Sequence, residues 1–262
     1  MWGIYDELIA AVPSDLIVEE FIFGLHWTLI RSRAIGMAHT PFSGGWGRGA
    51  PGSSPASGIG DRIAGMPVRK LAEYIKSWDS YESSLGLAAI NSALNTPEQL
   101  ETLGGQPISE QKQTSAFEYY ADTLRGKKVA VIGRFPDLDE LNKICRLSVL
   151  ERSPGPDDLP DFACEYVLPE QDYVFVTATA LLNKTLPRLL ELSCKSFTFL
   201  VGPSTPFSPT LFNHGIDSLA GTIVVDAKSV WQATQEGAAR GVFDHGAQMV
   251  KVSKREWLVT CQ

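Results

Sequence analysis

The stretch SFTFLVGPSTPFSPT, residues 196–210, gives the clearest indication of the fold. An apolar run of strand length, Phe197 to Val201, leads directly into a rigid, polar segment that is rich in proline. In parallel α/β sheets, turns of this kind at the carboxyl ends of strands hold ligands. The sequence therefore predicts a buried strand that ends at a ligand-binding turn. The candidate binding residues of this turn are Gly202, Pro203, Ser204 and Thr205.

From residue 113 onward, strand-like and helical patterns alternate. The strand-like runs lie at residues 128–133, 146–152, 172–178, 197–201 and 221–226, with a last run at 248–252. Helical patterns separate most of them, and alternation of this kind specifies a doubly wound sheet. We therefore expect an α/β protein whose second domain, residues 113–262, is Rossmann-like and mostly parallel.

The first part of the chain has a different pattern. A helix is expected from Trp2 to Val12, followed by β-rich runs at 16–23, 26–32 and 35–38 with short connections. Such runs predict a three-stranded antiparallel meander. Two helices follow, at 67–78 and 80–95. We expect an α+β domain over residues 1–112, ending in a polar, turn-rich segment.

Residues 42–60 are so rich in glycine, serine and proline that no regular element is expected there. Loops of this length are functional covers or connectors, and both interpretations stay open.

Composition excludes several classes of protein. The net charge is −7 and the basic residues are scattered, which argues against a nucleic-acid partner. No apolar run approaches the roughly 20 residues that a membrane span needs. The start, MWGIYDELIAAV, lacks the basic region of a signal peptide, so a cytoplasmic protein is expected. The four cysteines are far apart and predict free thiols, and a homo-oligomer stays open.

A second candidate turn follows the strand KKVAVIG. Gly133 ends this strand and Glu151 ends the next, as in dinucleotide folds, where an acidic residue holds the ribose. The turn GRFPD supplies only one glycine, however, and its Arg134 and Phe135 crowd the approach of a pyrophosphate. This argues against NAD or FAD and leaves a smaller ribose-bearing ligand, such as S-adenosylmethionine or a nucleoside, as the alternative.

A third candidate turn is TATALLN. Thr177 and Thr179 lie where a strand passes into a helix, and Asn183 follows one helical turn later. Their hydroxyl and amide groups could bind a small anion, or they could cap the helix. We expect this turn to lie beside the GPSTP turn in the sheet, which favours a pocket.

The sequence contains only weak indications of a metal site or a catalytic nucleophile. The chain has no GxSxG elbow, and its four histidines are dispersed. A divalent metal could be held by a mixed set of side chains from both domains. The weak candidates for such a set are His39, Glu82, Glu165 and Asp226.

Several segments together resemble a family of bacterial and archaeal proteins of unknown function, labelled "putative heavy-metal chelation domain". The similar segments are GLHWTLIRS, GMAHTP, LGLAAINSALN, KVAVIGRFP and FLVGPSTPFSPTLFNHGIDSLAG. The resemblance covers nearly the whole chain. It implies an N-terminal domain like the small domain of enolase, a Rossmann-like C-terminal domain, and a ligand cleft between them. It also implies that Thr40 joins the residues of the three turns in that cleft.

Three functions stay open at this point. The first is a protein that binds a small polar molecule or a metal chelate in the cleft, with a role in metabolism of a heavy-metal chelator. The second is a transferase that uses S-adenosylmethionine or another ribose-bearing cofactor. The third is a sensor or interaction module without catalysis. The sequence alone does not decide whether the protein is an enzyme.

Overall fold

The computed structural model describes residues 2–41, 63–108, 115–136 and 138–260. The first sheet along the chain has three antiparallel strands. Its strands, in the order β1-β2-β3, are β1 Glu20–Phe23, β2 Trp27–Arg31 and β3 Ile35–His39. The predicted meander is confirmed. Strand β1 begins four residues later than expected, and Ile17 makes only an isolated bridge with Pro67. The predicted loop at 42–60 lies outside the described residues.

The helices of the first part of the chain pack on this sheet and lead to the second sheet. They are α1 Gly3–Ala10, α2 Val68–Ala72, the 3₁₀ helix η2 Glu73–Lys76, α3 Ser80–Leu94 and α4 Pro97–Thr102. Asp79 caps α3 by accepting the backbone N–H groups of Tyr81 and Glu82. The helix expected at 67–78 ends at Lys76, and its second half is the 3₁₀ helix η2. Trp78 lies beyond the end of this helix and is 72% exposed.

Small residues let α3 lie directly on β3. A Cβ atom at Gly36 would stand 2.0 Å from the carbonyl oxygen of Ala88 and 2.1 Å from the backbone nitrogen of Ser92. Only glycine permits this approach, because any larger residue at position 36 would overlap the backbone of α3. Helix α3 is buried along most of its length.

The second sheet has eight strands in the order β4-β11-β10-β9-β8-β5-β6-β7. Neighbours from β10 through β7 are parallel, while β11 runs antiparallel to both β10 and β4. The expected mostly parallel sheet is confirmed. The strands are β4 Gln106–Pro107, β5 Lys128–Ile132, β6 Arg146–Glu151, β7 Leu159–Pro160, β8 Tyr173–Thr177, β9 Phe197–Val201, β10 Ser218–Val224 and β11 Ala247–Ser253.

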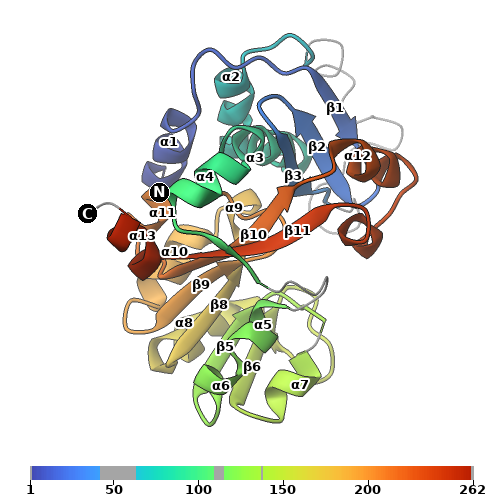
Figure 1. Cartoon of the computed structure of the whole chain (residues 1–262). Coiled ribbons are helices and arrows are strands. Elements are labelled where there is room, and N and C mark those ends of the chain that lie inside the picture. The colour runs from blue at the N-terminus through green and yellow to red at the C-terminus, as the bar shows by residue number, and fades with distance from the viewer. Residues whose placement is uncertain (1, 42–62, 109–114, 137, 261–262) are drawn as a thin grey trace.

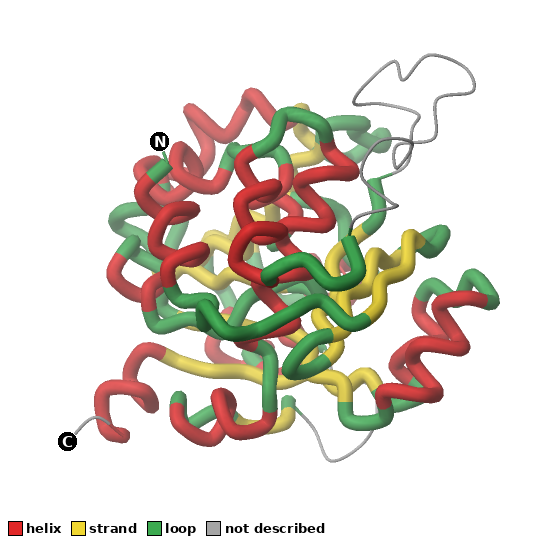
Figure 2. The backbone as a smooth tube through the Cα atoms, turned by 90° about the horizontal axis from the view of Figure 1, so that it is seen from above, coloured by secondary structure: helices red, strands yellow, loops and turns green. Residues whose placement is uncertain are grey.

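Helices cover both faces of the larger sheet, and Figure 2 shows them at the periphery with the strands between them. Side chains alternate across the sheet, so Val129 and Val131 face one cluster while Ala130 faces the other. The first face carries α5 Ala116–Tyr119, α6 Ala121–Leu124 and α7 Leu138–Asn142. The second carries α8 Cys164–Val167, α9 Thr179–Leu182, α10 Leu186–Leu192 and α11 Thr210–Asn213, with short 3₁₀ helices at Asp161–Ala163 and Leu168–Glu170.

The two sheets are packed together. Helix α3 contacts both β3 and α9, and β10 contacts β3. Helix α12, Ala227–Gln235, returns to the small sheet (Figure 1). Its Val230 packs with Leu29 and Met37 of that sheet, on the face opposite α3. A 3₁₀ helix at Arg240–Phe243 and the last helix, α13 Lys254–Thr260, complete the described chain. The predicted division near residue 112 falls between described segments and stays a prediction.

Every helix in the described ranges is too short or too polar to cross a lipid bilayer.

Candidate functional site

The strand order locates a topological switch point. The parallel strands β7-β6-β5-β8-β9-β10 read 3-2-1-4-5-6 in chain order, because the chain moves from β5 toward one side and then continues from β8 toward the other. Ligands of doubly wound sheets bind outside the carboxyl ends of the strands at such a reversal. The candidate site is therefore the crevice above the ends of β5 and β8.

A pocket of about 340 Å³ opens at this point, and we call it the switch-point pocket. Its lining residues come from the carboxyl ends of β5, β6, β8 and β9 and from the small sheet. They are Trp27, His39, Gly133, Arg134, Phe135, Glu151, Thr177, Ala178, Thr179, Val201, Gly202, Pro203 and Ser204. The β8 and β9 turns are neighbours, as the sequence predicts, because β8 pairs with β9 up to Thr177 and Val201.

Most of the predicted ligand-binding residues come together here. Those that line the switch-point pocket are Gly133, Glu151, Thr177, Thr179, Gly202, Pro203 and Ser204. Thr40, Asn183 and Thr205 do not line it. The Thr40 hydroxyl is paired with the Thr28 hydroxyl at 3.0 Å, and Asn183 accepts the backbone N–H of Thr185 at 3.0 Å. Thr205 is fully buried.

Glycine is required at two of the turns. Gly133 and Gly202 have φ values of 93° and 113°, which disfavour any residue with a Cβ atom. A Cβ at Gly133 would also stand 3.1 Å from Cγ2 of Thr177. The β5 turn therefore lies close against Thr177 of the β8 turn because its bend is a glycine.

Hydroxyl groups supply hydrogen-bond donors to the pocket. The Thr177 and Thr179 hydroxyls are 3.0 Å apart, so one donates to the other and the acceptor keeps its own hydrogen for a ligand. Ser204 Oγ accepts the backbone N–H of His39 at 2.9 Å, which leaves the Ser204 hydroxyl hydrogen to donate as well.

Glu151 is the acceptor on the opposite side of the pocket. Its two carboxylate oxygens accept the backbone N–H groups of Arg134, at 2.9 Å, and of Arg152, at 2.8 Å. These bonds fix the carboxylate beside the Gly133 turn. Each oxygen keeps a lone pair that a ligand hydroxyl can use. The Arg134 side chain is engaged in an ion pair with Asp158, so it does not offer an uncompensated charge.

Two asparagines at the end of α3, Asn91 in its last turn and Asn95 at its C-cap, hold the β9 turn in place, and the sequence analysis did not single them out. Asn91 donates to the carbonyl oxygens of Met37, at 2.7 Å, and Ser204, at 3.0 Å. Asn95 donates to the carbonyl oxygen of Thr205 at 2.9 Å and accepts the N–H of Phe207 at 2.9 Å. Both are buried. Their spacing of one helical turn within a small, apolar face is the signal that could have found them.

Aromatic side chains form the rest of the wall. Trp27 and His39 are opposite each other in the β2–β3 ladder, and their rings meet edge to face at 6.2 Å. Phe135 lies against both glycine turns, and its ring packs on Phe117 with the centroids 5.4 Å apart. Burial, and to a smaller degree the charge of His26, lowers the pKa of His39, so its imidazole is neutral at pH 7.

The described residues do not fit a bare metal ion. In the described part of the chain, no three His, Cys, Asp or Glu side chains gather closely enough to hold one. Of the weak metal candidates, only His39 lines the pocket. Glu82 accepts the Ser77 hydroxyl, Glu165 pairs with Arg188, and Asp226 caps α12. Each of these three carboxylates has a local structural role.

Comparisons with known proteins agree with this fold. A crystal structure from Desulfitobacterium hafniense, of a DUF364 family protein with unknown function, is 36% identical with a TM-score of 0.86 and covers 97% of this chain and 99% of that one. A DUF364 family structure from Pyrococcus horikoshii, also of unknown function, has a TM-score of 0.72 at 20% identity, covering 95% and 98%. It supports the fold alone.

An uncharacterized protein of Methanocaldococcus jannaschii is 34% identical over 169 residues, which is 60% of this chain and 62% of that protein. Family models match residues 5–94 (DUF4213) and residues 115–253 (DUF364), and both are described as "Putative heavy-metal chelation". Since the second match alone spans more than half of the chain, this protein belongs to the DUF364 family.

Proposed function

We propose that this protein binds a small organic molecule in the switch-point pocket, and that any metal enters as a chelate of that molecule. The observation that carries the proposal is the meeting of the β5, β8 and β9 turns at the reversal of strand order, with hydroxyl groups from two of them on one pocket. Ligands of doubly wound sheets bind at this place.

The lining indicates the kind of molecule. The volume of about 340 Å³ is at the small end of the range for ligand pockets, which suits a single metabolite. Thr179 and Ser204 supply hydroxyl groups, Glu151 is an acceptor, and the charge of Arg134 is balanced by Asp158. A molecule with several polar groups, among them donors for the Glu151 carboxylate, satisfies these side chains.

The donor set explains why a metal would need an organic carrier. His39 and Glu151 are the lining residues whose side chains are usual metal ligands, and both oxygens of Glu151 already accept backbone N–H groups. Structural and catalytic zinc sites use at least three protein ligands. A chelator that fills the coordination sphere itself removes this requirement.

Native mass spectrometry of gently purified protein, with elemental analysis, tests the proposal. We expect wild-type protein to carry a molecule of metabolite mass, and any bound metal to be present in proportion to it. Thr179→Phe places a ring in the pocket and should abolish the added mass. Thr123→Phe, at an exposed site on α6, is the matched control and should retain it. An added mass that Thr179→Phe leaves unchanged, or a metal bound without an organic molecule, would contradict the proposal.

A ribose-bearing cofactor of a transferase is the second candidate. The position of Glu151 favours it, because a carboxylate that ends the strand next to the glycine turn can accept both hydroxyls of a ribose. Calorimetry with S-adenosylmethionine is the test. We expect Glu151→Gln to weaken binding about tenfold, and Glu140→Gln, at an exposed position of α7, to leave it unchanged. If wild-type protein does not bind the compound, this candidate is removed.

A further inference from the structure

A second pocket lies at the amino ends of β9 and β10, at the end of the larger sheet opposite the switch-point pocket. We call it the tyrosine pocket. Its volume is about 570 Å³, within the range of small-molecule sites. Its lining residues come from α5, from the amino ends of β9 and β10, and from the end of β11 with α13. They are Tyr119, Tyr120, Phe197, Asp217, Lys251, Ser253, Lys254, Arg255, Glu256 and Leu258.

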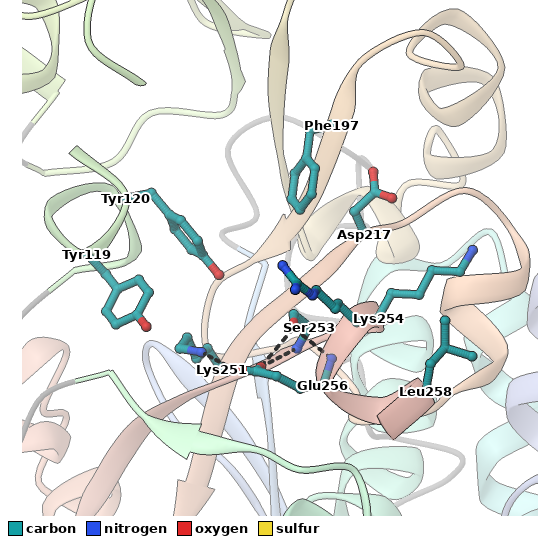
Figure 3. A pocket seen from close by; sticks show the side chains of 10 residues that line it. Tyr119, Tyr120, Phe197, Asp217, Lys251, Ser253, Lys254, Glu256 and Leu258 are labelled. Atoms are coloured by element: carbon teal, nitrogen blue, oxygen red, sulfur yellow. Dashed lines mark hydrogen bonds and ion pairs between the residues drawn. The ribbon is translucent and has the colours of Figure 1, made fainter. Parts of the chain in front are cut away.

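The walls of this pocket are aromatic and partly exposed. Figure 3 shows Tyr119 and Tyr120 on one side, Phe197 on β9, and Leu258 of α13 on the far side. Tyr119, Phe197 and Leu258 are 44%, 40% and 49% exposed, and all three line the same pocket. An aromatic ring in the pocket would find apolar surface on these walls.

Packing beneath the pocket holds these rings in position. The Tyr120 ring packs on Phe199 with the centroids 4.7 Å apart, and Phe197 packs on Phe199 at 4.9 Å. The Tyr120 hydroxyl is 3.1 Å from the Ser218 hydroxyl. The aromatic surface is therefore largely pre-formed, which lowers the entropy cost of binding a flat molecule.

The charge of the tyrosine pocket is opposite to that of the whole chain. The chain carries −7, yet the pocket has three cations, Lys251, Lys254 and Arg255, against two carboxylates, Asp217 and Glu256. The local excess is one positive charge, which favours an anionic ligand.

Two of the cations are already engaged. The Lys251 side chain is 4% exposed, pairs with Glu256 at 2.9 Å and lies 5.0 Å from the centre of the Tyr119 ring. Burial lowers the pKa of Lys251, but the hydrogen bond and charge of Glu256 outweigh it and keep the pKa raised. Lys254 donates to the carbonyl oxygen of Phe212 at 3.0 Å. Glu256 also closes the start of α13 by accepting the N–H of Ser253 at 3.1 Å.

Arg255 is the cation that remains. None of the side chains that the structure describes forms a hydrogen bond or an ion pair with its guanidinium, and Arg255 is exposed at the pocket. A guanidinium matches the geometry of a carboxylate with two parallel hydrogen bonds. The aromatic walls and this cation together define one ligand chemistry.

We propose that the tyrosine pocket binds a small aromatic carboxylate, with its ring against Tyr119, Tyr120 and Phe197 and its carboxylate on Arg255. This site is separate from the switch-point pocket, since Phe197 begins β9 and Val201 ends it. It needs no metal and no ligand in the other pocket.

Isothermal titration calorimetry with a matched pair of probes tests the proposal. The probes are naphthalene-2-carboxylate and its neutral analogue naphthalene-2-carboxamide. We expect the carboxylate to bind about tenfold more tightly than the carboxamide, because a charge-assisted hydrogen bond to Arg255 is lost in the amide. Equal affinities, or no binding of the carboxylate, would overturn the proposal.

Variants locate the binding. Arg255→Gln should weaken the carboxylate about tenfold and leave the carboxamide unchanged. Tyr119→Ala removes part of the wall and should weaken both probes alike. Lys228→Gln removes an exposed cation on α12, away from the pocket, and should change neither by more than about twofold. Carboxylate affinity that is unaffected by Arg255→Gln would contradict the assignment.

Discussion

Strand β9 joins two pockets that differ in construction. At its carboxyl end, the switch-point pocket is formed mainly by backbone turns, which glycines at two bends and buried asparagines of α3 hold in place. At its amino end, the tyrosine pocket is formed by side chains, several of them exposed, around the ion pair of the buried Lys251 with the partly exposed Glu256. Substitutions at residues that support the first pocket should therefore lower the free energy of unfolding, whereas substitutions in the second pocket should change it little.

Gly36→Ala should have the largest effect on the free energy of unfolding. The new methyl group would overlap the backbone of α3, whose asparagines position the β9 turn. We expect a loss of about 3 kcal/mol or more in the free energy of unfolding, measured by urea denaturation followed by circular dichroism. Gly3→Ala is the control, since nothing lies within 4 Å of its Cβ position. Equal stabilities of the two variants would show that α3 and β3 are not in close contact.

Asn95→Ala should have the next largest effect. It removes hydrogen bonds to Thr205, Thr222 and Phe207 and leaves buried backbone groups without partners. We expect the free energy of unfolding to fall by about 2–3 kcal/mol. Asn142→Ala, at the exposed end of α7, should change it by less than about 0.5 kcal/mol. Similar losses in both variants would contradict the role given to α3.

Lys184 gives a test that depends on pH. It follows α9, has a φ of 64°, and donates to the Leu182 carbonyl at 2.7 Å and the Ser83 hydroxyl at 2.9 Å, which ties the β8 turn to α3. Burial lowers the pKa of Lys184 to about 8, against 10.5 for an exposed lysine. Between these values the unfolded chain binds more protons than the folded one, so the stability contributed by this group rises with pH.

The comparison is with Lys184→Met, which cannot titrate. From pH 7 to pH 10, wild-type protein should gain about 2 kcal/mol in free energy of unfolding relative to the variant. The contribution is largest above pH 10.5 and is lost as pH falls through about 8. Parallel pH profiles for the two proteins would mean that the ammonium group is hydrated in the folded state.

Arg255→Gln is expected to have the smallest effect on stability. Arg255 is exposed and has no ion pair with any side chain that the structure describes, so the free energy of unfolding should change by less than about 0.5 kcal/mol. A larger loss, measured by the same denaturation, would show that the tyrosine pocket also supports the fold.

The sequence predicts the switch-point pocket better than the tyrosine pocket for a physical reason. The run Phe197 to Val201 is apolar and bounded by Gly202, so the strand and its turn are specified locally, and β9 has these bounds. Alternation of strands and helices then places the turns after β8 and β9 at one edge. Both steps need only short-range patterns and the general topology of α/β sheets.

The parts that could not be predicted depend on contacts between distant segments. The tyrosine pocket combines residues 119–120, 197, 217 and 251–258, none of which carries a local motif. The return of α12 to the small sheet and the contact of Trp27 with the pocket likewise follow from tertiary packing. The resemblance to the family implies Thr40, and the GPSTP turn implies Thr205. Neither lines the pocket, because Thr40 pairs with Thr28 and Thr205 is fully buried beside Asn95.

Equilibrium dialysis against a filtered extract of small metabolites, with mass spectrometry of the retained compounds, tests the central claim most directly. Wild-type protein, Thr179→Phe and Arg255→Gln would be compared side by side. We predict at least one compound that wild-type protein and Arg255→Gln retain and Thr179→Phe does not. If Thr179→Phe retains every compound that wild-type protein retains, the switch-point pocket is not the ligand site.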